Sequence, residues 1–276
     1  MNPPEDLSEW IGRQTQVATD QITPRMVDSF AATFHPHFHA NQPVPPGIHW
    51  CLCPTLEPAH NLGADGHPTK GAMLPPVSLP RRMWAGGKIT TLAPFAVGDV
   101  VTRTTSIQNI IWKTGASGAL CFVTVAHEFA TPRGTAIQEL HDIVYRGDGP
   151  VRPAEAAQDT AAFDLEWQVR VTPTMLFRYS ALMFNGHRIH YDLRYAQQTE
   201  GYDDLVIHGP LQATMLLNLA ASHLGQVPRH FRYRALAPAT GAQNMRFGLS
   251  ADDGGGALVA QTEAGGQTMH ATALLR

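Results

Sequence analysis

The chain has 276 residues and a formal net charge of −3, with 20 Lys and Arg against 23 Asp and Glu. This balance excludes the basic surface that nucleic-acid binding requires, and no run of about 18 apolar residues is present that could span a membrane. The first residues lack the pattern of a secretory signal, and three cysteines in so long a chain do not form a disulfide framework. We therefore expect a cytoplasmic protein without nucleic-acid or membrane partners.

A segment at residues 147–160 is rich in Gly, Pro, Ala and acidic residues and has no apolar period, which is typical of a linker. It predicts two domains, residues 1–149 and residues 150–276. The order of expected elements is similar on both sides of this segment, and we interpret the chain as a degenerate internal duplication.

The first part is predicted to begin with a helix over Thr23–Phe34, which carries apolar residues at helical spacing. Thr23 is suited to the N-cap and Pro24 to the first helical position. A long loop rich in Pro and Gly follows. Strand-like runs separated by turn residues are then expected at residues 88–94, 100–112, 119–129 and 136–145.

The second part repeats this order. A helix that again begins with Thr-Pro is predicted over Thr172–Phe184, and residues 205–208 form a short apolar run that predicts a strand. Gly209, as N-cap, and Pro210 open an apolar helix that ends at Gly225 and should be largely buried. Strand-like runs close the chain at residues 231–236, 243–249, 257–263 and 267–275.

Histidine is frequent, at 14 residues, and raises the question of metal binding or catalysis. Cys51 and Cys53 lie among histidines in the Pro-rich loop, but their spacing does not match that of zinc sites, so we expect no metal there. Nucleophile elbows, phosphate loops and dinucleotide-binding fingerprints are also missing from the sequence. The histidines interpreted as loop residues without a metal are His35, His37, His39, His49, His60 and His67.

A second group of polar residues, at 185–192, directly follows an apolar helix. It contains His187 and His190, and His208 comes just before the buried helix. The free N–H groups at that helix start, including the N–H of Gly209, form a ready site for an oxyanion. A base and an oxyanion site are what chemistry beside a thioester carbonyl requires, although capping or core histidines are the alternative interpretation.

The stretch from Tyr179 to Pro210 resembles the hydratase-2 signature of the MaoC-like, hot-dog-fold (R)-enoyl-thioester hydratases. The signature Asp and Asn are replaced here by Asn185 and His187. The positions that match the signature are His190 as its histidine, Asp192 as the following acid, and Ile207-His208-Gly209 as its last motif.

Further segments narrow this likeness to one branch of the family. They look like the mesaconyl-C4-CoA or itaconyl-CoA hydratases, to which the mitochondrial 3-hydroxyacyl-thioester dehydratases are also similar. The segments are residues 81–87, 97–99, 139–146 and 184–192. The resemblance implies an α+β double hot-dog fold, in which each of two tandem repeats is a long helix wrapped by an antiparallel sheet. It also implies an active site between the halves, with catalytic residues from the second.

The resemblance implies a hydro-lyase that adds water reversibly to an α,β-unsaturated acyl-CoA, here a C5 dicarboxylic thioester that becomes citramalyl-CoA. His190 is expected to be the base, Asn185 to orient the water, and the N–H of Gly209 to stabilise the enolate-like oxygen. Supporting roles are expected for His187, Asp192 and His208. No cofactor is expected besides the CoA of the substrate, and a homodimer is left open.

Asn185 cannot take a proton, which leaves three alternatives for the proton transfer. His190 can act alone, His187 can share the work, or a first-half carboxylate, Glu139 or Asp142, can enter the site. We favour the first because it changes the family pattern least.

A dicarboxylic substrate also needs a cation for its distal carboxylate. The candidates are Arg188, Arg81 and Arg82, because a guanidinium binds a carboxylate in a bidentate manner. The rival functions are a 3-hydroxyacyl-thioester dehydratase of fatty-acid type, an acyl-CoA thioesterase, and a protein that binds acyl thioesters without catalysis.

Overall fold

The computed structural model describes residues 6–39, 41–115, 118–149, 154 and 162–276. The predicted domain boundary at 149/150 and most of the predicted linker lie outside these ranges. The strands are β1 (Gln14–Gln21), β2 (Arg81–Thr91), β3 (Val100–Gly115), β4 (Gly118–Thr131), β5 (Gly134–Arg146), β6 (Leu165–Val171), β7 (His230–Ala235), β8 (Gln243–Asp252), β9 (Gly255–Gln261) and β10 (Gln267–Leu274). The helices are α1 (Pro24–Phe34), α2 (Pro173–Met183), α3 (Leu193–Gln198) and α4 (Gly209–Leu224).

All these strands belong to one antiparallel sheet with the order β1-β3-β4-β5-β2-β7-β10-β9-β8-β6. Each strand of the first half has a counterpart at the mirrored place in the second, from β1 and β6 at the edges to β2 and β7 in the centre. The halves join where β2 pairs with β7, from Gly86 opposite Arg234 to Thr90 opposite His230. The order agrees with the inferred duplication and confirms the α+β double hot-dog fold.

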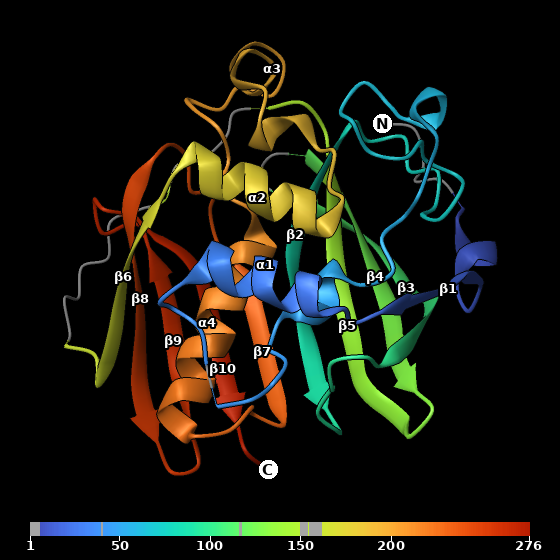
Figure 1. Ribbon diagram of the computed structural model, residues 1–276. Coiled ribbons are helices and arrows are strands. Elements are labelled where there is room, and N and C mark those ends of the chain that lie inside the picture. The colour runs from blue at the N-terminus through green and yellow to red at the C-terminus, as the bar shows by residue number, and fades with distance from the viewer. Residues whose placement is uncertain (1–5, 40, 116–117, 150–153, 155–161) are drawn as a thin grey trace.

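Helices α1 and α2 lie side by side across one face of the sheet (Figure 1). Both begin as predicted, because a threonine before each proline accepts a hydrogen bond from the backbone three residues on. Thr23 Oγ1 accepts from the N–H of Met26 at 3.1 Å, and Thr172 Oγ1 accepts from the N–H of Met175 at 3.2 Å. Each bond satisfies an N–H that the helix itself leaves free.

Helix α4 is the buried helix of the second half, packed against β8, β9 and β10 (Figure 1). Every residue from Leu211 to Ala221 is buried, which confirms the prediction from its broad apolar face. Its start is one residue earlier than predicted, with His208 as N-cap and Gly209 as the first helical residue. The predicted strand at residues 205–208 is wrong, because this short run makes a single bridge, between Val206 and Thr240, before α4 begins.

The first half differs from the implied fold because no described residue there forms a long central helix. Between α1 and β2 the described chain has only the short 3-10 turns η2 (Ile48–Cys51) and η3 (Ala59–Asn61). Prolines flank η2, and a proline interrupts helical hydrogen bonding, so the turn cannot extend. Ile48, His49 and Cys51 are nevertheless buried, so this loop fills the interior of the first half.

Three elements, β1, β6 and α3, were not predicted, and a fourth, β2, begins earlier than predicted. Strands β1 and β6 are the two edges of the sheet, where each strand has a partner on one side only and polar residues weaken the alternating pattern. Strand β2 begins at Arg81 rather than at residue 88, so Arg82 and Trp84 also lie on a central strand. Short helix α3 follows the predicted polar group.

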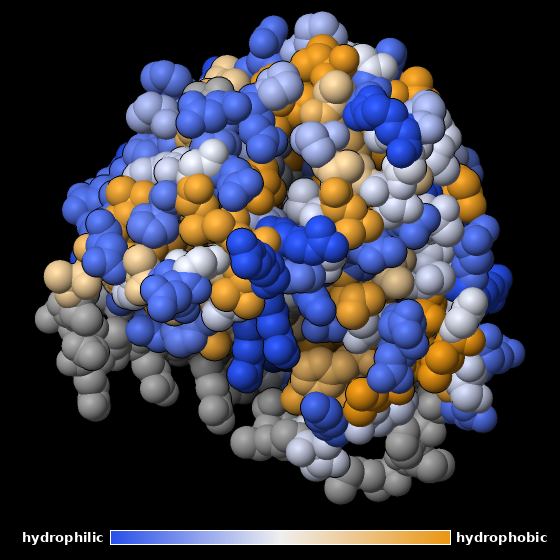
Figure 2. Space-filling view, turned by 90° about the horizontal axis from the view of Figure 1, so that it is seen from below, coloured by the Kyte–Doolittle hydropathy of each residue, from blue (hydrophilic) through white to orange (hydrophobic). Residues whose placement is uncertain are grey.

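None of the helices in the described ranges has both the length and the apolar character needed to cross a bilayer. Figure 2 shows the face seen from below, where hydrophobic residues are interspersed with hydrophilic ones.

Candidate active site

The polar group after α2 folds into a tight loop held by its own side chains. Phe184 ends α2 in the left-handed conformation, with φ at 52°. Asn185 Oδ1 then accepts the N–H of His187 at 3.0 Å. Asp192 caps α3, because its Oδ1 accepts the N–H of Tyr195 at 3.0 Å. The loop thereby leaves both His187 and His190 buried.

His190 has the protonation pattern of a base. Its Nδ1 lies 2.7 Å from the carbonyl oxygen of Val206, which can only accept a hydrogen bond, so Nδ1 carries the proton. Nε2 of the neutral ring is then an acceptor. Burial lowers the pKa of His190 to about 4, against the opposing effect of the Val206 hydrogen bond. The ring is therefore neutral near pH 7, with an unprotonated Nε2.

His208 supports the His190 ring from one side. The two rings are stacked with centroids 3.6 Å apart and planes inclined by 16°. His208 is fully buried, its Nε2 lies 2.8 Å from Ser180 Oγ, and burial lowers its pKa well below the ordinary value. A neutral, fixed ring of this kind holds His190 in place.

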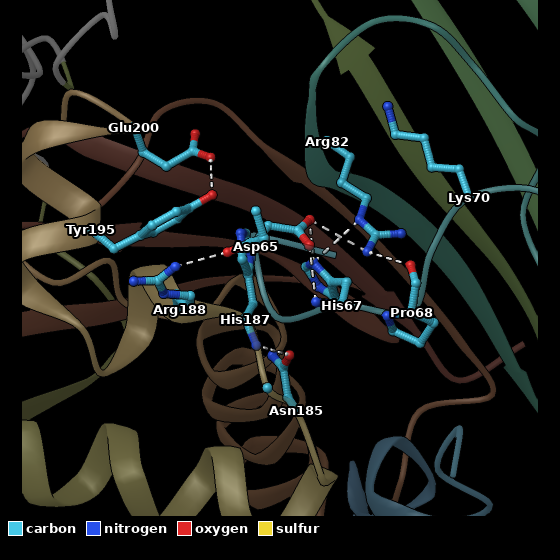
Figure 3. A network of polar contacts seen from close by, with 12 residues as sticks. Asp65, His67, Pro68, Lys70, Arg82, Asn185, His187, Arg188, Tyr195 and Glu200 are labelled. Atoms are coloured by element: carbon cyan, nitrogen blue, oxygen red, sulfur yellow. Dashed lines mark hydrogen bonds and ion pairs between the residues drawn. The ribbon is translucent and has the colours of Figure 1, made fainter. Parts of the chain in front are cut away.

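Further ring contacts, edge-on between His190 and His187 and tilted between His187 and His67, lead from His190 into the first half. The ring centroids of His187 and His190 are 5.5 Å apart, and those of His67 and His187 are 4.1 Å apart. Asp65 Oδ2 lies 3.0 Å from His67 Nδ1 (Figure 3). His67, His187, His190 and His208 thus form a continuous array, called here the histidine array, with Asp65 at its first-half end.

The sequence interpretation did not include Asp65 or His67 in the site. The loop that carries them is docked on the second-half loop by its backbone, since the N–H of Arg188 donates to the carbonyl oxygen of Asp65 at 2.9 Å. Gly66 has φ at 85°, and a Cβ there would collide with the carbonyl oxygen of Gly186. The Asp-Gly-His spacing is the one local signal that could have drawn attention to this loop.

Arg82 places a positive charge beside the cluster formed by Asp65, His67 and His187. Its Nε donates to His67 Nδ1 at 3.2 Å, and its Nη2 lies 3.5 Å from Asp65 Oδ2 (Figure 3). Asp65, His67 and His187 present ligand-type atoms within 4.8 Å of one another, as a metal site would. The guanidinium already contacts two of these residues, however, and repels a second cation, so the cluster is better suited to proton transfer or to an anion.

The other two predicted arginines join the halves together. Arg188 donates to Asp192 Oδ2 through Nε at 3.1 Å and Nη2 at 2.8 Å, and to the carbonyl oxygen of Ala64 through Nη1 at 3.0 Å. Arg81 of β2 donates to the carbonyl oxygens of residues 199 and 200. Each arginine thus contacts the other half, Arg188 through Nη1 and Arg81 through its bonds to residues 199 and 200.

The N-terminus of α4 faces an aromatic wall. A Cβ on Gly209 would collide with the ring of Trp84, so only glycine fits there. Trp84 stacks on Tyr233 with ring centroids 4.5 Å apart, and Trp50 meets Trp84 edge-on at 5.9 Å. The N–H of Gly209 makes no hydrogen bond to another residue that the structure describes, which leaves it free for a ligand.

Glu139 and Asp142, the carboxylates considered from sequence, have other partners. Glu139 is buried behind the wall, where its Oε1 accepts from Trp50 Nε1 at 2.8 Å and from the Tyr233 hydroxyl at 3.1 Å. Burial raises the pKa of Glu139, while these hydrogen bonds lower it. Asp142 Oδ1 accepts from Thr124 Oγ1 at 2.6 Å. The first-half carboxylate that the described contacts bring to the histidine array is Asp65.

A double hot-dog sheet with a buried histidine beside a helix N-terminus agrees with the class of hot-dog hydratases and dehydratases of acyl thioesters. The family of hydroxyacyl-thioester dehydratases type 2 matches residues 47–241, and the chain belongs to this family.

Three similar proteins agree with this assignment. The chain is 40% identical over 238 residues to mesaconyl-C(4)-CoA hydratase of Chloroflexus aurantiacus, which covers 84% of this chain and 85% of that protein. It is 25% identical over 268 residues to the mitochondrial hydroxyacyl-thioester dehydratase type 2 of Schizosaccharomyces pombe, covering 85% and 89%. The crystal structure of a MaoC-like dehydratase from Phytophthora capsici, at 15% identity and a TM-score of 0.69, covers 98% of this chain and 99% of its own and supports the fold alone.

Proposed function

We propose that this protein adds water reversibly to the double bond of an α,β-unsaturated acyl-CoA, with mesaconyl-C4-CoA or itaconyl-CoA as the favoured substrate. The observation that carries the proposal is the protonation state of His190. Its Nδ1–H is committed to the Val206 carbonyl, so an unprotonated Nε2 is available in a buried site near the start of α4.

In the proposed reaction, His190 Nε2 takes one proton from water while the water oxygen bonds to the β-carbon. The electron pair of the double bond moves toward the thioester oxygen, where the N–H of Gly209 and the α4 dipole stabilise the negative charge. The imidazolium of His190 then returns the proton to the α-carbon. Dehydration of a 3-hydroxyacyl thioester is the same sequence in reverse, and neither direction calls for a cofactor besides CoA.

Asn185 keeps the role of orienting the water, with one restriction. One lone pair of its Oδ1 already accepts the N–H of His187. A carbonyl oxygen has a second lone pair, and the amide also offers its N–H groups. Asn185 can therefore hold a water but cannot act as a second base.

Two features support a short acyl group with a second carboxylate. Trp84 closes the space beyond Gly209, which favours a short chain over a fatty acyl chain. Arg82 is the arginine within the cluster that contains His187, where its Nε donates to His67 and its Nη2 to the carbonyl oxygen of Pro68, whereas Arg81 and Arg188 make contacts between the halves. We therefore propose Arg82 as the receptor of the distal carboxylate.

The relatives support the same class of reaction. The protein with 40% identity is named for the hydration of mesaconyl-C4-CoA, while the family as a whole is named for dehydration of hydroxyacyl thioesters. Dehydration of fatty-acid-type substrates is thus the second candidate.

The test is a panel of mesaconyl-, itaconyl- and crotonyl-CoA, followed by loss of the enoyl-thioester absorbance, with a 3-hydroxyacyl thioester for the reverse direction. We expect the highest kcat/KM with a C5 dicarboxylic thioester. A preference for crotonyl-CoA or longer substrates would favour the dehydratase alternative. Release of free thiol in place of hydration would instead identify a thioesterase.

A further inference from the structure

We infer that Asp65 and His67 of the first half are positioning residues that hold His187 against His190 and supply the negative charge that the second-half motif lacks. The active site is then shared between the halves, rather than provided by the second half alone. The inference rests on the proposed hydratase function and deepens it.

The second-half loop contains no free carboxylate for this task. The resemblance to the MaoC-like hydratases places an aspartate where this chain has Asn185, and the amide carries no charge. Asp192, the other acid of the motif, caps α3 and pairs with Arg188 at 2.8 Å, and none of its described contacts reaches the histidine array, whereas Asp65 contacts His67 as well as Arg82. The negative charge that assists the base must therefore come from another segment.

A close backbone contact between Gly66 and Gly186 places Asp65 beside the histidine array. Gly66 and Gly186 approach so closely that a Cβ on either residue would collide with the other's carbonyl oxygen. The hydrogen bond from the N–H of Arg188 to the carbonyl oxygen of Asp65, at 2.9 Å, fixes the same approach. The glycine contact and the hydrogen bond together set the position of Asp65 and His67 relative to His187.

His67 is held at one ring nitrogen by two groups of the first half. Its Nδ1 faces an acceptor, Asp65 Oδ2 at 3.0 Å, and also a donor, Arg82 Nε at 3.2 Å. The nitrogen can donate to the first or accept from the second, depending on its protonation. The His67 ring packs on His187 at 4.1 Å, so a change at Nδ1 is felt directly by His187.

The charges around His187 show why the carboxylate matters. The groups that face this ring are His67, His190, Asp65 and Arg82. The pKa of His187 is lowered to about 3, chiefly by burial and in addition by His190 and Arg82, while Asp65 raises it. When His190 takes a proton from water, the array becomes positively charged in a buried place. Asp65 is then the acidic group among these neighbours that stabilises the charge.

The test compares two variants, Asp65→Asn and His67→Gln, with the wild-type enzyme on mesaconyl-CoA and crotonyl-CoA. Asp65→Glu serves as the conservative rescue, and the exposed residues His60 and Asp203 provide the matched controls His60→Gln and Asp203→Asn. Circular dichroism and thermal melting establish that each variant is folded.

We expect Asp65→Asn and His67→Gln to lower kcat about ten- to hundredfold with both thioesters, while KM changes by less than about threefold. Asp65→Glu should recover most of the activity, and the controls should match the wild type. Asp65→Asn should also move the acidic limb of the kcat/KM profile to lower pH, because it removes the group that raises the pKa of His187. Merely structural damage would lower activity at all pH values without moving this limb.

The outcomes separate this inference from the proposed function. Wild-type kcat and pH profiles in Asp65→Asn and His67→Gln, beside an inactive His190→Ala enzyme, would overturn the inference and leave the hydratase intact. A loss confined to KM would reassign the pair to substrate binding and overturn their positioning role. A wild-type enzyme inactive on every thioester of the panel would overturn both.

Discussion

The two halves of this protein share a strand order but differ in what they enclose. The second half surrounds α4, whose buried residues are mostly apolar, the polar ones being Gln212, Thr214 and Asn218. The first half has the short turn η2 in the corresponding stretch of chain and surrounds a group of aromatic and titratable side chains. The difference fits the division of labour proposed above, in which the second half supplies the base and the helix N-terminus while the first half bounds the acyl site and adds charge.

The interior of the first half contains buried polar atoms that lower the free energy of unfolding. His49 and Glu139 are buried, and the side-chain nitrogens His49 Nε2 and His141 Nε2 have no hydrogen-bond partner among the described residues. A buried polar group left without a partner costs roughly 1–3 kcal/mol. In the second half, the buried polar residues of α4, Gln212, Thr214 and Asn218, each have a hydrogen-bond partner. The following experiments break this contrast or make it sharper.

The largest effect is expected in the second half, at the base. His190→Ala should lower kcat for hydration about 10²- to 10⁴-fold, because it removes Nε2, the nitrogen that takes the proton from water, together with the Nδ1–H that Val206 holds. Turnover of mesaconyl-CoA under single-turnover conditions measures it, with the exposed His223→Ala as the control. Near-normal turnover in His190→Ala would remove His190 from the mechanism.

The next effect tests Trp84, a first-half residue of the aromatic wall beside Gly209. Trp84→Ala should open space beside Gly209 and raise the kcat/KM of a C8 enoyl-CoA relative to crotonyl-CoA by about tenfold or more. It should also destabilise the protein by about 3 kcal/mol, since the ring packs on Tyr233 and Trp50. Trp84→Phe, which keeps an aromatic wall, is the control. An unchanged chain-length preference in a folded Trp84→Ala enzyme would show that the wall does not bound the acyl site.

A third comparison sets Arg82 of the first half against Arg188 of the second. Arg82→Met should raise KM about tenfold for mesaconyl-CoA but little for crotonyl-CoA, because a charged hydrogen bond to the second carboxylate is lost. Arg188→Met should affect both thioesters equally through weaker docking of the loops. The opposite pattern would transfer carboxylate recognition to Arg188.

The smallest effect is on the pH dependence of the free energy of unfolding, and it involves a histidine from each half. Burial lowers the pKa of His141 to about 3 and of His190 to about 4, from 6.5. The unfolded chain therefore binds more protons than the folded one below pH 6.5, so the stability present above that pH is lost as the pH falls toward 4.

Urea unfolding at pH 7.5 and pH 5 measures this loss. Each such histidine should account for on the order of 2 kcal/mol at pH 5, so His141→Gln should flatten the pH dependence by about that amount. His230→Gln, at a half-buried position on β7, is the control. A pH dependence as steep in His141→Gln as in the wild type would mean that the neutral form of His141 is not what the fold requires.

Much of the fold could be predicted because its signals are local. The Thr-Pro starts of α1 and α2 and the apolar face of α4 each lie within a short window, and the structure confirms all three. The missed elements depend on their surroundings. Strands β1 and β6 are specified by the sheet edges they join, and the replacement of a central helix by η2 depends on the side chains that fill the same space.

The candidate site divides in the same way. The loop at 185–192 was found because it is continuous in the sequence and matches a family signature. Asp65 and His67 were not found, because more than a hundred residues separate them from His187 and their own loop carries only an Asp-Gly-His spacing. The carboxylates considered instead, Glu139 and Asp142, lie on strand β5, and their described partners are other side chains.

The structure shows which of the many histidines lie together in the candidate site. By itself, the sequence determined the starts of α1 and α2, the buried helix α4 and the loop that carries His190, since hydrogen-bonding caps and apolar periodicity act between near neighbours. The tertiary structure decided that His67 joins His187, His190 and His208, that Val206 fixes the proton of His190, and that Trp84 covers Gly209. These contacts arise only when β2 pairs with β7 and the loops of the two halves pack together.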